Sequence, residues 1–350
     1  MKETGDFTKG RIFVPFIRFA GPILAALLLQ SLYGAVDMLV VGRFSTPAEV
    51  SAVSTGSMLM QLLTSVVTGT AVGTTVLLGQ KIGEGRASEG GRIIGATCVL
   101  FLIMGVIMTL IAEVFPLPIL RLLQTPAEAF SSATAYVRIC GGGAVFIIAY
   151  NVLGSIFRGV GNSRMPLITV AIASAFNVAG DLLLVAVFHM GAAGAAAATV
   201  AAQALSVLLS FLIIRHQSLP VSFHFSDLCW DPPRMKTILS LGYPIALADL
   251  LVGVSFLVIL SIVNTLGVIP SAGVGIAEKV CAFIMLVPSA FSQSMSSFVA
   301  QNIGAGQKKR ADTALRYGIL LSLAAGILMG WLAFFHGSLL TGIFTSEPAV

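Results

Sequence analysis

The chain has 350 residues, of which 57% are hydrophobic and only 10% are charged. Soluble globular domains carry roughly 25% charged residues, so this composition excludes an ordinary soluble protein and indicates a membrane protein. The formal net charge of +5 invites a nucleic-acid partner, but the positions of the basic residues argue against one, as described below.

Nine segments are long and apolar enough to cross a membrane. A transmembrane helix needs about 20 apolar residues to span a hydrocarbon core of about 30 Å. The predicted spans lie near residues 16–42, 50–78, 93–119, 132–157, 166–188, 192–214, 238–266, 270–300 and 317–345. No segment shows the ten-residue alternation of barrel strands, so a helical bundle is predicted.

The basic residues predict the orientation. If the N-terminus is cytoplasmic, sixteen of the twenty Lys and Arg residues fall on the inner side. This bias favours a multi-pass protein of the cell membrane with an inside N-terminus, and it explains the positive charge without nucleic acid. The first eleven residues lack a cleavable signal, so the first hydrophobic helix is expected to act as an uncleaved insertion signal.

The sequence repeats itself at an offset of about 221 residues. "GQKIGEGRASEGGR" from Gly79 resembles "AQNIGAGQKKRADTALR" from Ala300, and "AGPILA" at 20–25 resembles "GYPIAL" at 242–247. Six predicted helices separate equivalent points, so the two copies are expected to have the same orientation and a pseudo-twofold axis along the membrane normal.

The repeat defines the expected fold class and domains. We expect an all-α polytopic membrane protein, a two-lobed inverted-V bundle of two parallel six-helix repeats. A complete pair would have twelve helices and about 440 residues, so nine helices indicate an incomplete second lobe. The expected divisions are an N-terminal lobe at 1–215, a cytoplasmic linker at 216–236 and the first three helices of a C-terminal lobe at 237–350.

Polar residues of the first copy fall in one predicted layer. Counting along each helix at 1.5 Å per residue places five of them roughly 6–11 Å below the outer surface. They are Asp37, Asp181, Thr199, Tyr136 and Arg138, and Asn177 lies one turn deeper than Asp181 on the same helix face. Ionisable residues inside a membrane are expected to mark an ion or substrate site.

Two acids in one low-dielectric pocket cannot both ionise cheaply, so such a pair is suited to exchanging a proton. Asn177 and Thr199 would add uncharged oxygen ligands, so a Na⁺ site at Asp37, Asn177, Asp181 and Thr199 is also chemically possible. The alternative is a structural salt bridge, with Arg138 as the most plausible partner of the acids.

Four stretches resemble the multidrug and toxic compound extrusion (MATE) family of cation-coupled antiporters. They are "GAVDMLVVGR", "GQKIGEG", "FRGVGNSRMPLI" and "FNVAGDLLL", in this order and spacing. The resemblance implies that Asp37, Asn177, Asp181 and Thr199 form a cation-coupling cluster. It also implies that Tyr136 lies beside that cluster and that Pro22 is a point at which the first helix bends.

Three further intramembrane charges are candidates for a substrate cavity. Asp249 lies near the middle of the seventh span, and Glu278 and Lys279 lie in the eighth. No GxxxxGK[ST] phosphate loop is present and the histidines lack metal-ligand spacing, so neither a cofactor nor a bound metal is expected.

The leading hypothesis is a monomeric secondary antiporter. It would export amphipathic or cationic small molecules in exchange for H⁺ or Na⁺ by alternating access. A flippase for lipid-linked precursors is an alternative of the same architecture, although buried acids outnumber buried bases here. An intramembrane aspartyl protease is a remote alternative, because Val178 replaces the first glycine of a GxGD element. The leading hypothesis predicts no enzymatic activity.

Overall fold

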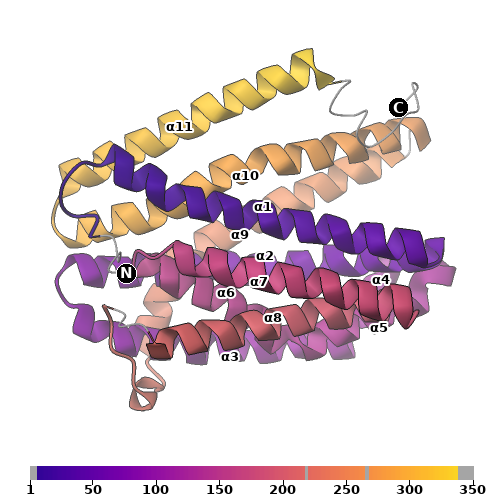
Figure 1. Cartoon of the computed structure of the whole chain (residues 1–350), viewed down its shortest axis with the longest axis horizontal. Helices are drawn as coiled ribbons and strands as arrows, with labels where there is room; N and C mark the ends of the chain where they lie inside the picture. Colours follow the sequence, from indigo (N-terminus) through magenta and orange to yellow (C-terminus); the bar gives the residue numbers. More distant parts are fainter. Residues whose placement is uncertain (1–5, 217–219, 265–267, 338–350) are drawn as a thin grey trace.

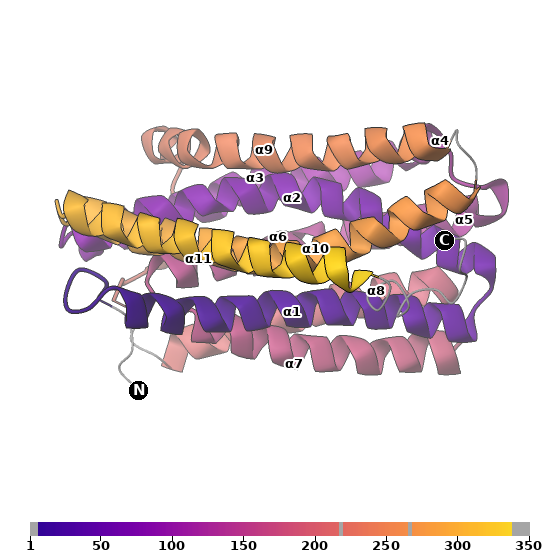
Figure 2. The same cartoon turned by 90° about the horizontal axis from the view of Figure 1, so that it is seen from above.

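A computed structural model describes residues 6–216, 220–264 and 268–337, and within these ranges the chain is helical without strands. The helices run nearly parallel to one long axis (Figures 1 and 2). They are α1 (Phe13–Phe44), α2 (Pro47–Gly83), α3 (Gly90–Val114), α4 (Pro116–Leu122), α5 (Ala127–Gly142), α6 (Ala144–Gly159), α7 (Arg164–Asp181), α8 (Gly191–His216), α9 (Pro232–Asn264), α10 (Val268–Gly304) and α11 (Lys308–Phe335). The predicted all-α polytopic bundle is confirmed.

The described residues contain eight helices that could cross a membrane, or nine if α5 and α6 form one bent span. The span predicted at 132–157 is a bent pair of helices, α5 and α6, in the structure. The chain bends by 55° between α5 and α6, at the last of three consecutive glycines, which weaken a helix because they lack side chains. At the bend, Gly143 packs directly against the side chain of Val200, where a Cβ atom would clash.

The span predicted at 93–119 is shorter in the structure. α3 ends at Val114, and a separate short helix, α4, begins at Pro116. A proline is compatible with the first turn of a helix but not with its interior, because it lacks an N–H donor and its ring clashes with the preceding turn. Pro116 therefore begins the new helix.

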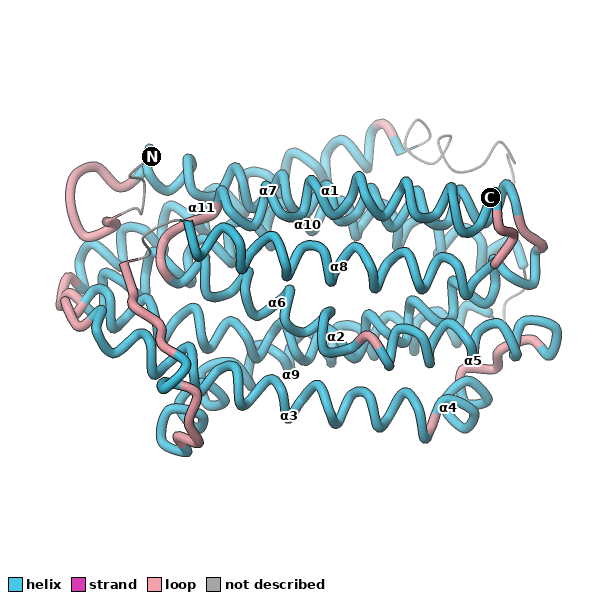
Figure 3. The backbone as a smooth tube through the Cα atoms, turned by 60° about the horizontal axis from the view of Figure 1, so that its bottom comes forward, coloured by secondary structure: helices cyan, strands magenta, loops and turns pink. Residues whose placement is uncertain are grey.

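The loops gather at the two ends of the bundle, as Figure 3 shows. We call one the basic end; it holds residues 6–12, 84–89, 160–163, 220–231 and 305–307. The other, the far end, holds residues 45–46 and 188–190 together with α4. Between the ends, α2 is the central helix, because it packs against α5 and α6 on one side and α9 and α10 on the other.

Glycines bring α2 and α10 into close contact at the basic end. A Cβ atom on Gly83 would clash with the backbone oxygen of Gln301, and one on Gly304 would clash with the backbone oxygen of Gln80. Both contacts join a glycine to a glutamine, and each residue lies 221 positions from its counterpart. This reciprocal pair of contacts, which we call the glycine seam, holds α2 against α10 at the basic end.

The segment before α1 is bound to α10 and α11 at the same end. The backbone N–H of Phe7 donates to Oε1 of Gln301 at 3.4 Å, and Nδ2 of Asn302 donates to the oxygen of Phe7 at 3.2 Å. The Arg310 guanidinium donates to the backbone oxygens of Phe7, Lys9 and Gly10 at 2.6–3.0 Å. The ring of Phe7 packs between those of Phe19 and Phe298.

α9 begins at Pro232, inside the stretch 216–236 that the sequence predicts to be a linker. The described part of that stretch packs on the start of α3. Val221 covers Gly90, and the backbone of Asp227 lies against Gly95 so closely that a Cβ atom there would clash. The boundaries of the two predicted lobes stay a prediction.

Candidate functional site

The close approach of α7 and α8 brings their polar residues together. α7 begins where the Oδ1 atom of Asn162 accepts the N–H groups of Arg164 and Met165, both at 3.2 Å. Near its other end, a Cβ atom on Gly180 would lie only 3.0 Å from that of Ala198 in α8. A larger residue at position 180 would push the helices apart, so this glycine sets the spacing of the neighbouring Asp181 and Thr199.

Asp37, Asn177, Asp181 and Thr199 form one cluster, which we call the acid cluster. The Thr199 hydroxyl donates to Oδ2 of Asp37 at 3.4 Å, and Nδ2 of Asn177 donates to the Thr199 hydroxyl at 3.5 Å. The carboxyl groups of Asp37 and Asp181 lie near each other and interact electrostatically. Three helices, α1, α7 and α8, therefore converge on one site.

The cluster holds oxygen atoms that are buried without a hydrogen-bond partner. Asp37, Asn177 and Asp181 are 7%, 1% and 0% exposed. Both carboxyl oxygens of Asp181, Oδ1 of Asp37 and Oδ1 of Asn177 accept no hydrogen bond. A buried, unsatisfied polar group costs about 1–3 kcal/mol, so these oxygens are available to a proton, a water molecule or a small cation.

The chain leaves α-helical geometry directly after Asp181. Residues Leu182–Val187 form a π-helical segment, a wider turn that often occurs at functional sites. Since Asp181 is the last residue of α7, small changes in this segment would move its carboxyl group relative to Asp37. Among the described residues, no Lys, Arg or His forms an ion pair with either acid.

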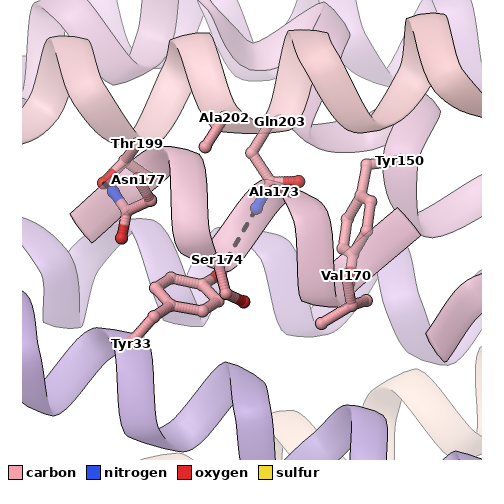
Figure 4. Close-up of a pocket in the computed structure, with 9 residues that line it drawn as sticks. All are labelled: Tyr33, Tyr150, Val170, Ala173, Ser174, Asn177, Thr199, Ala202 and Gln203. Atoms are coloured by element: carbon pink, nitrogen blue, oxygen red, sulfur yellow. Dashed lines mark hydrogen bonds between the residues drawn. The ribbon is translucent and has the colours of Figure 1, made fainter. Parts of the chain in front are cut away.

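A small cavity of about 10 Å³ lies beside the acid cluster, lined in part by Asn177 and Thr199 (Figure 4). This volume holds roughly one water molecule. Tyr33, Ser174 and Gln203 also line it, and Nε2 of Gln203 donates to the Tyr33 hydroxyl at 3.5 Å.

The sequence analysis missed these three residues, although helical spacing points to them. Tyr33 lies four positions before Asp37, Gln203 lies four after Thr199, and Ser174 lies three before Asn177. Residues three or four positions apart lie on one face of a helix.

The MatE family model matches residues 22–183 and 244–350, which together make up most of the chain. The chain belongs to the MATE family. Because members of this family are membrane transporters and not enzymes, the protease hypothesis is set aside.

Relatives of this MATE protein include two proteins named as probable multidrug resistance proteins. YoeA of Bacillus subtilis is 28% identical over 336 residues, which are 94% of this chain and 73% of YoeA. NorM of Thermotoga maritima is 24% identical, over 95% of this chain and 72% of NorM. A Shewanella oneidensis protein named as an FAD transporter is also 24% identical, over 100% of this chain and 78% of that protein.

Solved structures of MATE transporters share the fold. A transporter of the MOP superfamily from Pyrococcus furiosus superposes with a TM-score of 0.92 at 20% identity, over 99% of this chain and 77% of that one. An outward-facing multidrug resistance MATE transporter gives a TM-score of 0.90 at 20% identity, over 99% of this chain and 77% of that one.

Of the two side chains predicted to assist the cluster, Tyr136 is buried and Arg138 is not. Tyr136 packs against Gly56 of α2. The side chain of Arg138 is half-exposed and lies 3.9 Å from the carboxylate of Glu113 instead. The two residues are separated by two positions on one helix and so point to different faces. Pro22 lies inside α1, which continues through it as one helix.

Of the three charges predicted to line a substrate cavity, Asp249 and Glu278 lie outside the acid cluster. Asp249 is exposed on α9 of this MATE protein, and Glu278 is half-buried on α10. The side chain of Lys279 lies outside the part of the chain that the structure describes. Their role in substrate binding stays a prediction.

Proposed function

We propose that this MATE protein exports amphipathic, cationic small molecules in exchange for protons. The observation that carries the proposal is the buried, neighbouring pair of Asp37 and Asp181, whose free oxygens have no basic partner among the described residues. Such a pair gains a proton readily from one side of a membrane and releases it to the other. The oxygens of Asn177 and Thr199 make Na⁺ the competing candidate for the coupling ion.

The architecture suits alternating access. The glycine seam holds α2 against α10 at the basic end, whereas α11 diverges from α1 toward the far end (Figure 1). Since Lys and Arg are concentrated in cytoplasmic loops, we assign the basic end to the cytoplasm, with an inside N-terminus in the cell membrane. A proton arriving from the far end would then protonate the acid cluster, and each charge moved through 100 mV contributes about 2.3 kcal/mol.

Two features support a two-lobed mechanism with the linker at the basic end. The family model matches the chain in two separate segments, and the residues of the glycine seam are related by the offset of the sequence repeat. Relatives named as multidrug resistance or multidrug export proteins support a drug-like cargo.

Ethidium export under imposed gradients tests the proposal. Membranes containing the full chain should export ethidium when a proton gradient is applied, and the Asp37→Asn variant should not. Export driven by a Na⁺ gradient alone would mean that Na⁺, and not the proton, is the coupling ion bound at the acid cluster. Full coupled export by Asp37→Asn would contradict the proposal, and a wild-type protein that exports under neither gradient would favour the flippase alternative.

A further inference from the structure

A second, larger cavity lies nearer the basic end than the acid cluster. It has a volume of about 70 Å³ and is lined by residues of α1, α2, α6, α7, α8 and α10. Its polar lining consists of Gln30, Thr68, Tyr150, Asn151, Arg158 and Gln293, together with Ser210 and Thr169. None of its lining residues is acidic, so the positive charge of Arg158 is not neutralised there.

Arg158 has few partners for a charged group in this position. One guanidinium nitrogen donates to the Ser155 hydroxyl at 2.9 Å, and within the described ranges no carboxylate pairs with it. A guanidinium carries five N–H donors in a planar fork. Gly154 lies beside the guanidinium and has no side chain to crowd it. A Cβ atom at this position would lie only 3.2 Å from one guanidinium nitrogen.

The neighbours of Arg158 are held by bonds of their own. Nε2 of Gln30 donates to the Tyr150 hydroxyl, and Nδ2 of Asn151 donates to the backbone oxygen of Ile147 at 2.8 Å. These bonds fix the polar wall of the cavity without supplying a negative charge. A desolvated cation without a counter-ion is costly, and an anion with two oxygens matches the guanidinium fork.

We infer that this cavity binds a carboxylate or phosphate group of the cargo through Arg158. The inference rests on the proposed function, since it names a chemical group of the exported molecule. A single water needs at least about 10–15 Å³ of such volume, so 70 Å³ holds a group of carboxylate or phosphate size and not a whole drug molecule. The remainder of the cargo would extend out of the cavity.

The cavity is separate from the acid cluster but continuous with its surroundings. Along α7, Pro166 lines this cavity and Asn177 belongs to the acid cluster, eleven residues or about 16 Å further on. Tyr150 and Val170 line both this cavity and the small one beside the acid cluster. The two cavities therefore adjoin each other, with the positive site nearer the basic end and the acid cluster nearer the far end.

Two matched dyes test the inference with the full chain in phosphatidylcholine nanodiscs. Tetramethylrhodamine carries a carboxylate, and its methyl ester is the same cation without that group. Replacing Arg158 by Gln should weaken binding of the acid by about 10- to 100-fold, as expected for a charge-assisted bond. Binding of the ester should stay within about threefold, which also shows that the variant is folded.

Two further variants control the measurement. Arg158→Lys keeps the charge but loses the fork, so its affinity for the acid should fall between those of the wild type and Arg158→Gln. Arg18→Gln removes an exposed arginine from α1 and should leave both affinities unchanged. An unchanged affinity of Arg158→Gln for the acid, an equal loss for acid and ester, or a wild type that binds neither dye would overturn the inference.

A lipid phosphate has the same chemistry, so nanodiscs containing phosphatidylglycerol form the last arm. If phosphatidylglycerol abolishes binding of tetramethylrhodamine, and if this displacement requires Arg158, the site binds a lipid phosphate. That result would overturn the assignment of the site to cargo. Gradient-driven export of the ester is measured separately. If that export is absent while acid binding still depends on Arg158, the proposed antiport fails and the anion site stands.

Discussion

Asp181 and Gln301 are both buried polar residues of membrane-spanning helices, at 0% and 1% exposure, yet their surroundings differ. Oε1 of Gln301 accepts the N–H of Phe7 and its Nε2 donates to the oxygen of Gly159, both at 3.4 Å. Both oxygens of Asp181 have no partner. Gln301 therefore holds three segments together, whereas Asp181 keeps its binding capacity for an ion. Polar burial alone therefore does not identify a site.

The largest expected effect comes from replacing Asp181 by Leu. We expect gradient-driven ethidium export to be abolished, because the proton-binding pair is lost. The same variant should be as stable as the wild type or up to about 4 kcal/mol more stable, since an apolar residue of similar size replaces a buried group without partners. Export assays and thermal unfolding in one detergent check both halves.

Asp312→Leu is the matched control, because Asp312 is an exposed aspartate on α11. It should alter neither export nor the midpoint of unfolding. Coupled export that survives in Asp181→Leu would refute the role assigned to Asp181.

Gln301→Leu should have the opposite effect on stability. It removes the partners of the Phe7 N–H and the Gly159 oxygen, and each buried group left unpaired costs about 1–3 kcal/mol. We expect a loss of roughly 2–4 kcal/mol in the free energy of unfolding, measured by denaturant titration. Gln307→Leu, at an exposed position whose side chain caps no helix, is the control. Equal stability of the two variants would show that the contacts of Gln301 are not needed.

A smaller loss is expected from a single methyl group in the glycine seam. Gly83→Ala places a Cβ atom against the backbone of Gln301, which cannot move aside as a side chain could. Overpacking of this kind costs about 1–3 kcal/mol, and Gly304→Ala should cost the same if the seam is symmetric. Hydrogen exchange of residues 76–86 and 296–306 should rise in both variants.

Gly326→Ala tests whether the loss comes from the clash. Gly326 lies in α11, and a Cβ atom at this position would meet no other atom within 4 Å. Alanine favours helix by about 0.5–1 kcal/mol over glycine, so this variant should be neutral or slightly stabilised. If Gly326→Ala lost as much stability as Gly83→Ala, the loss in Gly83→Ala could not be attributed to the clash in the glycine seam.

Much of this arrangement was predictable from local pattern. Hydrophobic length predicted the helices, and helix direction with a fixed rise per residue placed Asp37, Asp181 and Thr199 at one depth. The structure brings these residues into one cluster. The depth of a residue in the membrane can be predicted from sequence, because it follows from counting residues along one helix.

Facing direction and contact between distant segments were harder to predict. The bend at Gly143 depends on Val200, 57 residues later, and the close approach of Gly83 depends on Gln301. Arg158 is one of the sixteen basic residues that the sequence places on the inner side, and its sequence neighbours do not show that it lines a cavity. Such features arise from tertiary packing, which hydropathy does not encode.

Arg138 provides the smallest expected effect and the sharpest contrast with the acid cluster. Its side chain is half-exposed and pairs with Glu113 at 3.9 Å, an arrangement that contributes about 0–1 kcal/mol. Arg138→Gln should therefore change stability by less than about 1 kcal/mol and leave export intact. A buried salt bridge with Asp37 or Asp181 would instead lose about 3–5 kcal/mol when one partner is removed. A loss of that size in Arg138→Gln, measured by denaturant titration, would contradict the position of Arg138 away from the acids.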